Sequence, residues 1–203
     1  MRKFSRCMIA LSFYFVLNSS VFANRWTPEM MIQYQRLSST AISEDGKFIA
    51  YEVSTPILES EKSEFHSQIW LLSSYDESRF QLTQGKTSSS QPKFSPDNKW
   101  LGFLSARGEK KTKQLFIISV SGGESIQITD LASSVNRFDW SPDALKIAFT
   151  MADPETDDDK KRKKEKRDWK IVDEDYKYNH LYVVSIKDIE ETRQLTKGDM
   201  NVG

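Results

Sequence analysis

A three-fold internal repeat constrains this chain more than any other feature of its sequence. Three segments align without gaps: SEDGKFIAY at Ser43–Tyr51, SPDNKWLGF at Ser95–Phe103 and SPDALKIAF at Ser141–Phe149. Each is followed by an apolar segment (QIWLLS, QLFIIS or HLYVVS) and then by a short QLT or QIT element. Between the second and third copies, the first element recurs after 46 residues, from position 95 to position 141. Agreement in order and spacing indicates a repeat architecture.

Each copy has the pattern of four short strands. In the second copy we expect strands at Pro92–Phe94, Lys99–Ser105, Gln114–Val120 and Glu124–Thr129, separated by turns with the sequences SPDN, RGEKKT and SGG. Four strands in about 40–45 residues correspond to one blade of a β-propeller. The sequence therefore predicts an all-β chain, a partial β-propeller of about three four-stranded blades. The blades are expected at about 37–84, 91–130 and 136–197 within a propeller region 37–203.

The residues of the first repeated turn have the properties that a tight turn needs. Pro96 and Pro142 set φ at the second turn position, and Gly46 and Asn98 tolerate positive φ at the fourth. Ala144 tolerates positive φ less well, so the third turn is expected to differ.

Small residues recur at one position of the strand that follows this turn. Ala50, Gly102 and Ala148 lie on the face opposite the large apolar residues, which are Ile49, Tyr51 and Val53, then Leu101 and Phe103, then Ile147 and Phe149. A small residue in a strand indicates close approach of a neighbouring sheet. Blades stacked face to face require such an approach.

The N-terminus, residues 1–23, has the three parts of a secretory signal peptide. Basic residues Arg2, Lys3 and Arg6 precede the apolar segment Met8–Leu17, and Val21-Phe22-Ala23 places small residues at a cleavage site. Ten apolar residues are too few to span a bilayer as a stable helix, although a membrane anchor or a buried helix is the alternative. We expect an exported protein, periplasmic or secreted, with no stable membrane span after cleavage. The only cysteine, Cys7, lies within the signal.

Two segments fall outside the repeat. Residues 24–36 are predicted to form a leader helix through Gln35, because Thr27-Pro28-Glu29 places proline at the first helical position. Residues 153–173 form a charged insertion in the third copy. Its mixed charges and lack of apolar periodicity predict a solvated loop or a short exposed helix.

Few residues of this sequence are candidates for a catalytic role. No G-x-S-x-G nucleophile elbow occurs, and the similar text GGES, at Gly122–Ser125, falls in a predicted hairpin turn. His66 lies in an expected polar loop. His180 opens a predicted strand and aligns with Gln68 and Gln114, which do not ionise. We therefore expect no catalytic residue in this chain.

Charged clusters are equally uninformative about ligands. The acidic triplet Asp157–Asp159 lacks the alternating spacing and central glycine of a calcium loop. The basic run Lys160–Lys164 has acidic flanks. The whole chain has 29 basic and 29 acidic residues, so it has no net positive charge that would favour the binding of nucleic acid. No cofactor-binding residue, metal site or nucleic-acid partner is expected.

The order of these segments resembles a known family. TPEMMIQYQRLSSTAIS, SEDGKFIAYEVS, FSPDNKWLGFLSAR and QLFIISVSGGESIQIT resemble the opening of the acylaminoacyl-peptidase and dipeptidyl-peptidase branch of the prolyl oligopeptidase family. The charged insertion followed by WKIVDEDYKYNHLYVV is similar to that branch as well, so the resemblance covers about residues 26–203. It implies a propeller of about seven or eight blades that gates peptide access to a C-terminal α/β-hydrolase domain with a Ser-Asp-His triad.

The chain departs from that pattern because it ends about three blades in, and none of its residues matches the family's catalytic motifs. The resemblance implies a non-catalytic propeller segment of an exported serine peptidase, whose hydrolase domain is absent from this chain. The expected partners are peptides, through a parent peptidase domain, or a protein that supplies the missing blades. The alternative is an exported binding module like the Tol-system propeller, acting by protein–protein contacts. A standalone enzyme is disfavoured by the lack of convergent catalytic groups.

Overall fold

The structure is a computed structural model, and it describes residues 27, 30, 33–59, 62–165, 177–199, 201 and 202. The predicted signal peptide, most of the predicted leader helix and residues 166–173 of the predicted insertion lie outside the described residues. Within the described part of the chain, no helix has the length and apolar character needed to cross a membrane.

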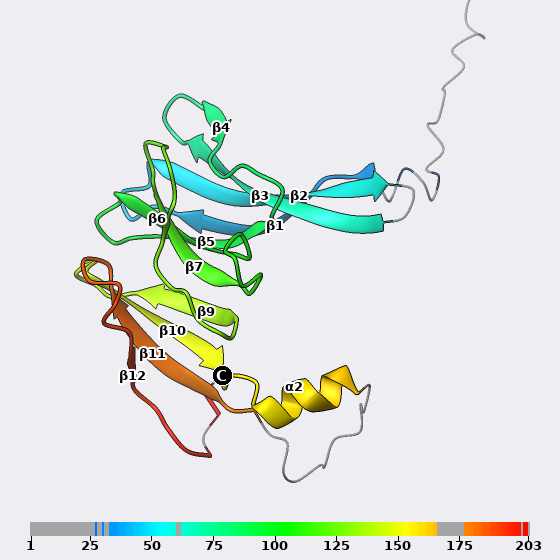
Figure 1. Ribbon diagram of the computed structural model, residues 1–203. Coiled ribbons are helices and arrows are strands. Elements are labelled where there is room, and N and C mark those ends of the chain that lie inside the picture. The colour runs from blue at the N-terminus through cyan, green and yellow to red at the C-terminus, as the bar shows by residue number, and fades with distance from the viewer. Residues whose placement is uncertain are drawn as a thin grey trace, which may run out of the picture. The chain divides into compact units, whose positions relative to one another are not determined.

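Three four-stranded antiparallel sheets follow one another along the chain (Figure 1). The first contains β1 (Arg36–Ile42), β2 (Phe48–Glu59), β3 (Lys62–Ser73) and β4 (Arg79–Gln81). The second contains β5 (Ser89–Phe94), β6 (Trp100–Ser105), β7 (Gln114–Ser119) and β8 (Ile126–Gln127). The third contains β9 (Val135–Trp140), β10 (Lys146–Ala152), β11 (Asn179–Ser185) and β12 (Arg193–Gln194). In each sheet the strands lie in chain order, so the predicted all-β fold of three four-stranded blades is confirmed.

The turn before the second strand of each blade is held by one serine and one aspartate. In the first blade, the Ser43 hydroxyl donates to Asp45 Oδ1 at 2.8 Å and accepts from the backbone N–H of Phe48 at 2.9 Å. The same serine-to-aspartate bond measures 2.6 Å in the second blade and 2.5 Å in the third. In the first blade, the bond from Ser43 lowers the pKa of Asp45. The repeat therefore encodes a locally closed turn.

All three turns have the same backbone conformation. The fourth turn residue has a positive φ in each blade: 68° at Gly46, 59° at Asn98 and 57° at Ala144. The expectation that the third turn differs is therefore wrong. The serine and aspartate hydrogen bonds, together with the bond from Ala144 N–H to Ser141 O at 2.9 Å, close the turn and place alanine in a conformation that its Cβ disfavours.

The short QLT or QIT element contains a threonine that ends the fourth strand. Thr83 Oγ1 accepts the backbone N–H of Ile69, and Thr129 Oγ1 accepts that of Leu115, each at 2.9 Å. The threonine hydroxyl thus accepts a backbone N–H of the third strand that a backbone carbonyl of the fourth strand would otherwise accept. The fourth strand of the second blade is accordingly Ile126–Gln127, shorter than the predicted Glu124–Thr129.

The blades stack face to face in a constant order. We call the face of Ile49, Tyr51 and Val53, and its equivalents in the other blades, the front face, and that of Ala50, Gly102 and Ala148 the back face. The back face of the first blade packs on the front face of the second in one apolar cluster: Ala50, Ile69, Leu71, Leu101, Phe103, Phe116 and Ile118. The back face of the second packs on the front face of the third in another: Leu104, Leu115, Ile117, Phe138, Ile147, Phe149 and Val184.

The predicted small positions serve this stacking where a neighbouring blade is described. A Cβ added to Gly102 would lie 2.7 Å from Phe138 Cε2, and Ala50 is fully buried. Leu101 and Phe103 on the front face of the second blade are also fully buried. Among the described residues nothing covers the front face of the first blade, where Ile49, Tyr51 and Val53 remain partly exposed.

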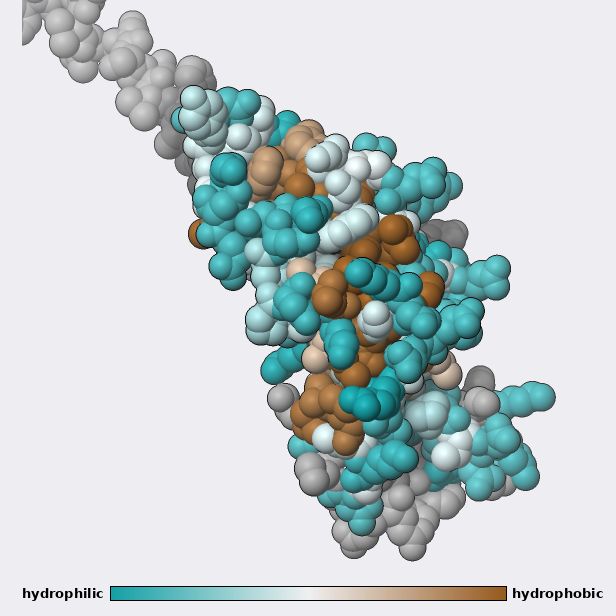
Figure 2. Space-filling model, turned by 90° about the vertical axis from the view of Figure 1, so that its left-hand side faces the viewer, coloured by the Kyte–Doolittle hydropathy of each residue, from teal (hydrophilic) through white to brown (hydrophobic). Residues whose placement is uncertain are grey.

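That front face lines a hollow of about 700 Å³ between Leu37, Tyr51, Trp70 and Leu72, among others. Large apolar side chains are also exposed elsewhere, including Tyr75 and Ile126. Figure 2 shows brown hydrophobic patches between teal hydrophilic side chains on the side of the molecule that lies at the left in Figure 1.

Two predicted segments outside the repeat are partly described. Gln33 is the last described helical residue before β1, so the predicted helix ends two residues before Gln35. The insertion contains α2 (Asp157–Lys164), the exposed helix that was one of the two expected alternatives. Thr156 and Asp159 exchange hydrogen bonds at its start, at 2.9 and 3.2 Å, as in a capping box. Hydrogen bonds to the Asp159 carboxylate from the backbone and then the side chain of Thr156, followed by the one from Lys177, lower the pKa of Asp159.

Candidate functional site

His180 is held among polar groups at the beginning of β11. It is 4% exposed, with Nδ1 3.4 Å from Thr196 Oγ1 and Nε2 3.4 Å from Asp153 Oδ1. The order hydroxyl, imidazole, carboxylate is that of a nucleophilic triad. Yet the Thr196 hydroxyl lies beyond the reach at which a base activates a nucleophile, and it accepts the N–H of Leu181 at 2.9 Å.

The other two blades show what this arrangement does. Gln68 and Gln114 occupy the equivalent position, and their Oε1 atoms accept from Thr83 and Thr129 at 2.7 and 2.8 Å. Because glutamine cannot act as a base, the repeated polar pair orders the start of the third strand. We assign His180 the same structural role.

His66 lies in strand β3, so its expected place in a polar loop is wrong. The β2–β3 hairpin continues to the pair Glu59↔Lys62, which incorporates the polar segment into the sheet. The His66 ring Nε2 lies 3.1 Å from Gln68 Nε2.

The acidic triplet Asp157–Asp159 forms the first turn of α2, where carboxylates favour the positive end of the helix dipole. Among the described residues, no three His, Cys, Asp or Glu side chains come together in a way that could hold a metal ion.

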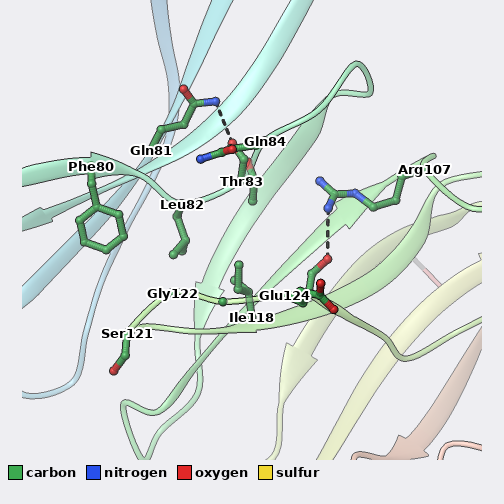
Figure 3. Close-up of a pocket in the computed structure, with 12 residues that line it drawn as sticks. Phe80, Gln81, Leu82, Thr83, Gln84, Arg107, Ile118, Ser121, Gly122 and Glu124 are labelled. Atoms are coloured by element: carbon green, nitrogen blue, oxygen red, sulfur yellow. Dashed lines mark hydrogen bonds between the residues drawn. The ribbon is translucent and has the colours of Figure 1, made fainter.

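A groove between the first two blades is a candidate site. It has a volume of about 630 Å³ and is lined by residues 80–84 of the first blade and by Arg107, Ile118 and residues 121–125 of the second (Figure 3). One wall is therefore the end of the fourth strand of the first blade. The opposite wall is the turn between β7 and β8, with Gly122 and Gly123 at positive φ.

Arg107 contributes the central polar group of this groove. Its Nε donates to Ser105 Oγ at 3.2 Å, Nη1 to Ser125 Oγ at 3.1 Å and Nη2 to Ser89 Oγ at 2.8 Å. The guanidinium carbon also lies 5.1 Å from the ring centroid of Phe103 and 5.4 Å from that of Phe116. The side chain is thus held from strands β5 and β6 and from the turn between β7 and β8 of one blade.

The charge of Arg107 is balanced by no ion pair among the described residues. Its acceptors are neutral hydroxyls, and burial lowers the pKa of its guanidinium, although arginine stays protonated in proteins. Glu124 is the acidic residue in the lining, and it is exposed without a salt bridge to Arg107. The groove therefore holds a half-buried positive charge next to open space.

Sequence reasoning missed Arg107, which appears only as the end of the segment FSPDNKWLGFLSAR. The equivalent positions of the other copies hold Thr55 and Asp153, so the repeat itself gives no signal for a cation there. A non-repeating charge at a repeated position is the one sign that could have marked it.

Comparisons with known proteins relate this chain to peptidases. Residues 46–113 match the family "Acylamino-acid-releasing enzyme, N-terminal domain". The uncharacterized peptidase YuxL of Bacillus subtilis (strain 168) is 35% identical over 108 residues, which are 53% of this chain and 16% of YuxL. Dipeptidyl-peptidase 5 of Porphyromonas endodontalis is 27% identical over 125 residues, 61% of this chain and 17% of that protein. The match spans about a sixth of the length of these relatives.

Solved structures share the fold. The acylaminoacyl peptidase of Pyrococcus horikoshii superposes with a TM-score of 0.64 at 18% identity, over 85% of this chain and 27% of that one. A putative TolB from Agrobacterium tumefaciens gives a TM-score of 0.52 at 20% identity, over 80% of this chain and 49% of that one. Structural likeness at this identity shows the fold alone, whereas the sequence relatives named above are peptidases. The family match and the sequence relatives together support the N-terminal β-propeller portion of a prolyl oligopeptidase-family peptidase.

Proposed function

We propose that this chain is the non-catalytic propeller segment of an exported serine peptidase of the acylaminoacyl-peptidase or dipeptidyl-peptidase type. In this role it gates the access of peptides to a hydrolase domain outside the chain. The observation that carries the proposal is the match of residues 46–113 to the N-terminal domain of acylamino-acid-releasing enzymes. The absence of a G-x-S-x-G segment from these 203 residues is consistent with catalysis elsewhere.

The uncovered front face of the first blade supports further blades in the same protein. Its residues Ile49 and Tyr51 are equivalent to Leu101 and Phe103, which are fully buried by the preceding blade. Burial of one large apolar side chain contributes roughly 1.5–3 kcal/mol. A further blade with a small residue on its back face would complete the same packing.

Labelling of the natural protein tests the peptidase assignment. An antibody against this chain recovers the protein from cells that produce it, and a fluorophosphonate probe then reports an activated serine. We expect a labelled species heavier than the 23.5 kDa of this chain. Recovery of an unlabelled species of 23.5 kDa or less would overturn the assignment.

The gating role is tested on the active enzyme with substrates of increasing length. A propeller that filters access predicts rapid cleavage of short acylated peptides and little cleavage of unfolded polypeptides with the same terminal sequence. Equal kcat/KM for both would contradict gating while leaving the peptidase assignment intact.

The binding-module alternative is favoured by the likeness to TolB, and it predicts a different result. In that case the antibody recovers a second protein that supplies blades, and the fluorophosphonate probe labels neither. Export is tested separately by mass spectrometry of the mature N-terminus, which we expect at Asn24.

A further inference from the structure

Arg107 has donor capacity that the chain does not use. A guanidinium carries five N–H donors, one on Nε and two on each terminal nitrogen. Three of them reach Ser105, Ser125 and Ser89. One N–H on Nη1 and one on Nη2 therefore remain without an acceptor among the described residues. Two parallel N–H groups on the terminal nitrogens are what a carboxylate binds in a bidentate pair.

The surroundings of Arg107 hold the guanidinium in position before any ligand arrives. The buried rings of Phe103 and Phe116 lie within 5.4 Å of its guanidinium carbon, at a range where their faces stabilise a cation. Ser89 and Ser125 each lie 18 residues from Arg107 along the chain, and Ser105 lies two residues from it. An arginine fixed in this way loses less conformational entropy on binding than a free surface lysine.

The groove beside Arg107 is large enough for part of a peptide. Figure 3 shows the guanidinium directed toward the turn that carries Gly122 and Glu124, with Thr83 and Gln84 on the opposite wall. Most of the lining is uncharged, so an anion entering the groove meets one positive and one negative side chain.

We propose that this groove binds the carboxylate of a peptide, with Arg107 as the anchoring cation and the groove walls in contact with the adjoining residues. The choice of a peptide as the bearer of the carboxylate rests on the proposed function. The carboxylate could be that of a peptide C-terminus or of an acidic side chain, since both present the same pair of oxygens. Glu124 then acts as a competing carboxylate at the mouth of the groove.

A purely structural role is the alternative to binding. As a tie between Ser89, Ser105 and Ser125, Arg107 would stabilise the second blade and leave peptides unbound. The two roles differ in their dependence on ligand charge, which permits a test on the unmodified chain.

The experiment titrates the full chain with matched peptides and follows the Arg107 Nε–Hε signal by NMR. N-acetyl-trialanine with a free C-terminus is compared with its C-terminal amide, and N-acetyl-Ala-Asp-Ala-amide is compared with its asparagine analogue. We expect saturable binding for at least one carboxylate peptide, at least tenfold weaker binding of its neutral analogue, and further weakening by salt. The pair that shows the difference identifies the source of the carboxylate.

Three variants complete the test. Arg107→Gln should weaken carboxylate binding at least tenfold, whereas Lys86→Gln removes one exposed positive charge outside the groove lining and should leave it unchanged. Glu124→Gln should tighten binding by removing the competitor. Equal binding of carboxylate and amide peptides, or no binding of either to the unmodified chain, would overturn the proposal even if Arg107→Gln fails to fold. Neither outcome affects fluorophosphonate labelling, so the two proposals can fail independently.

Discussion

Gly102 in the second blade lies against Phe138 in the third so closely that a Cβ on Gly102 would stand 2.7 Å from the ring carbon Cε2. The same added atom would lie 3.3 Å from Trp140 Nε1, which donates to Lys93 O at 3.1 Å. Phe138 is 2% exposed, so its ring is packed against neighbouring atoms and cannot move away without disturbing them. The distance between these two blades is therefore set by the absence of a side chain at position 102.

Gly102→Ala should lower the free energy of unfolding by about 1–3 kcal/mol, because overpacking forces the ring or the backbone to shift. Gly108→Ala is the matched control, since its Cβ would meet only the flexible end of Gln127, at 3.3 Å. Urea denaturation of the purified chain measures both. Equal midpoints for the two variants would show that the blades are not packed at this distance.

Ala144→Gly should stabilise the chain by about 1 kcal/mol, because alanine at φ 57° carries the left-handed penalty that glycine lacks. Asn98→Gly at the equivalent turn is the comparison. It also removes the 2.8 Å bond from the Glu44 N–H to Asn98 Oδ1, which links the first two blades, so no gain is expected there. Thermal unfolding followed by circular dichroism gives both values, and a lower Tm for Ala144→Gly would refute the prediction.

Thr129→Val should destabilise the second blade by about 1–3 kcal/mol, because it removes the acceptor of the buried Leu115 N–H and a donor to Gln114. Thr87→Val is the control, since the Thr87 hydroxyl takes part in no hydrogen bond among the described residues. Amide hydrogen exchange at Leu115 reports the local effect. Unchanged protection there would mean that the threonine does not terminate the strand as the structure indicates.

The free energy of unfolding should fall at acidic pH, in part because Asp76 becomes protonated. Hydrogen bonds from the Ser73 and Ser78 side chains lower the pKa of Asp76 to about 2. A carboxyl whose pKa is lower in the folded state contributes stability above its unfolded pKa of 3.8, and this contribution is lost as the pH falls toward 2.

Asp76→Asn should therefore flatten the fall of the urea midpoint between about pH 4 and pH 2. Asp199→Asn, at another exposed aspartate, is the control. An identical pH profile for Asp76→Asn and the unmodified chain would contradict the role of these serine hydroxyls.

Local sequence patterns predicted most of the secondary structure. The predicted strand Lys99–Ser105 is Trp100–Ser105 in the structure, and Gln114–Val120 is Gln114–Ser119. The fourth strand was predicted too long because Thr129 hydrogen-bonds through its side chain, which periodicity does not reveal. The third turn was predicted wrongly because intrinsic preference favours glycine over alanine, whereas the Ser141 and Asp143 pair decides the conformation.

Such local patterns could not predict the candidate groove. Arg107 meets Ser89 and Ser125, each 18 residues away, only after four strands have paired, and it faces residues 80–84 only after two blades have stacked. His180 shows the converse case. Its alignment with Gln68 and Gln114 predicted a polar structural residue, and its equivalent contact with a threonine is in keeping with that role.

By itself, the sequence of this protein determined the repeat, the turns and the alternation of large and small residues, because each depends on contacts within a few residues of chain. Only the tertiary structure decided that front faces pack on back faces, that Gly102 receives Phe138, and that Arg107 lies uncompensated beside a groove. The physical reason is that side chains distant in sequence meet at distances set by strand order and blade stacking. Those distances are properties of the folded chain as a whole.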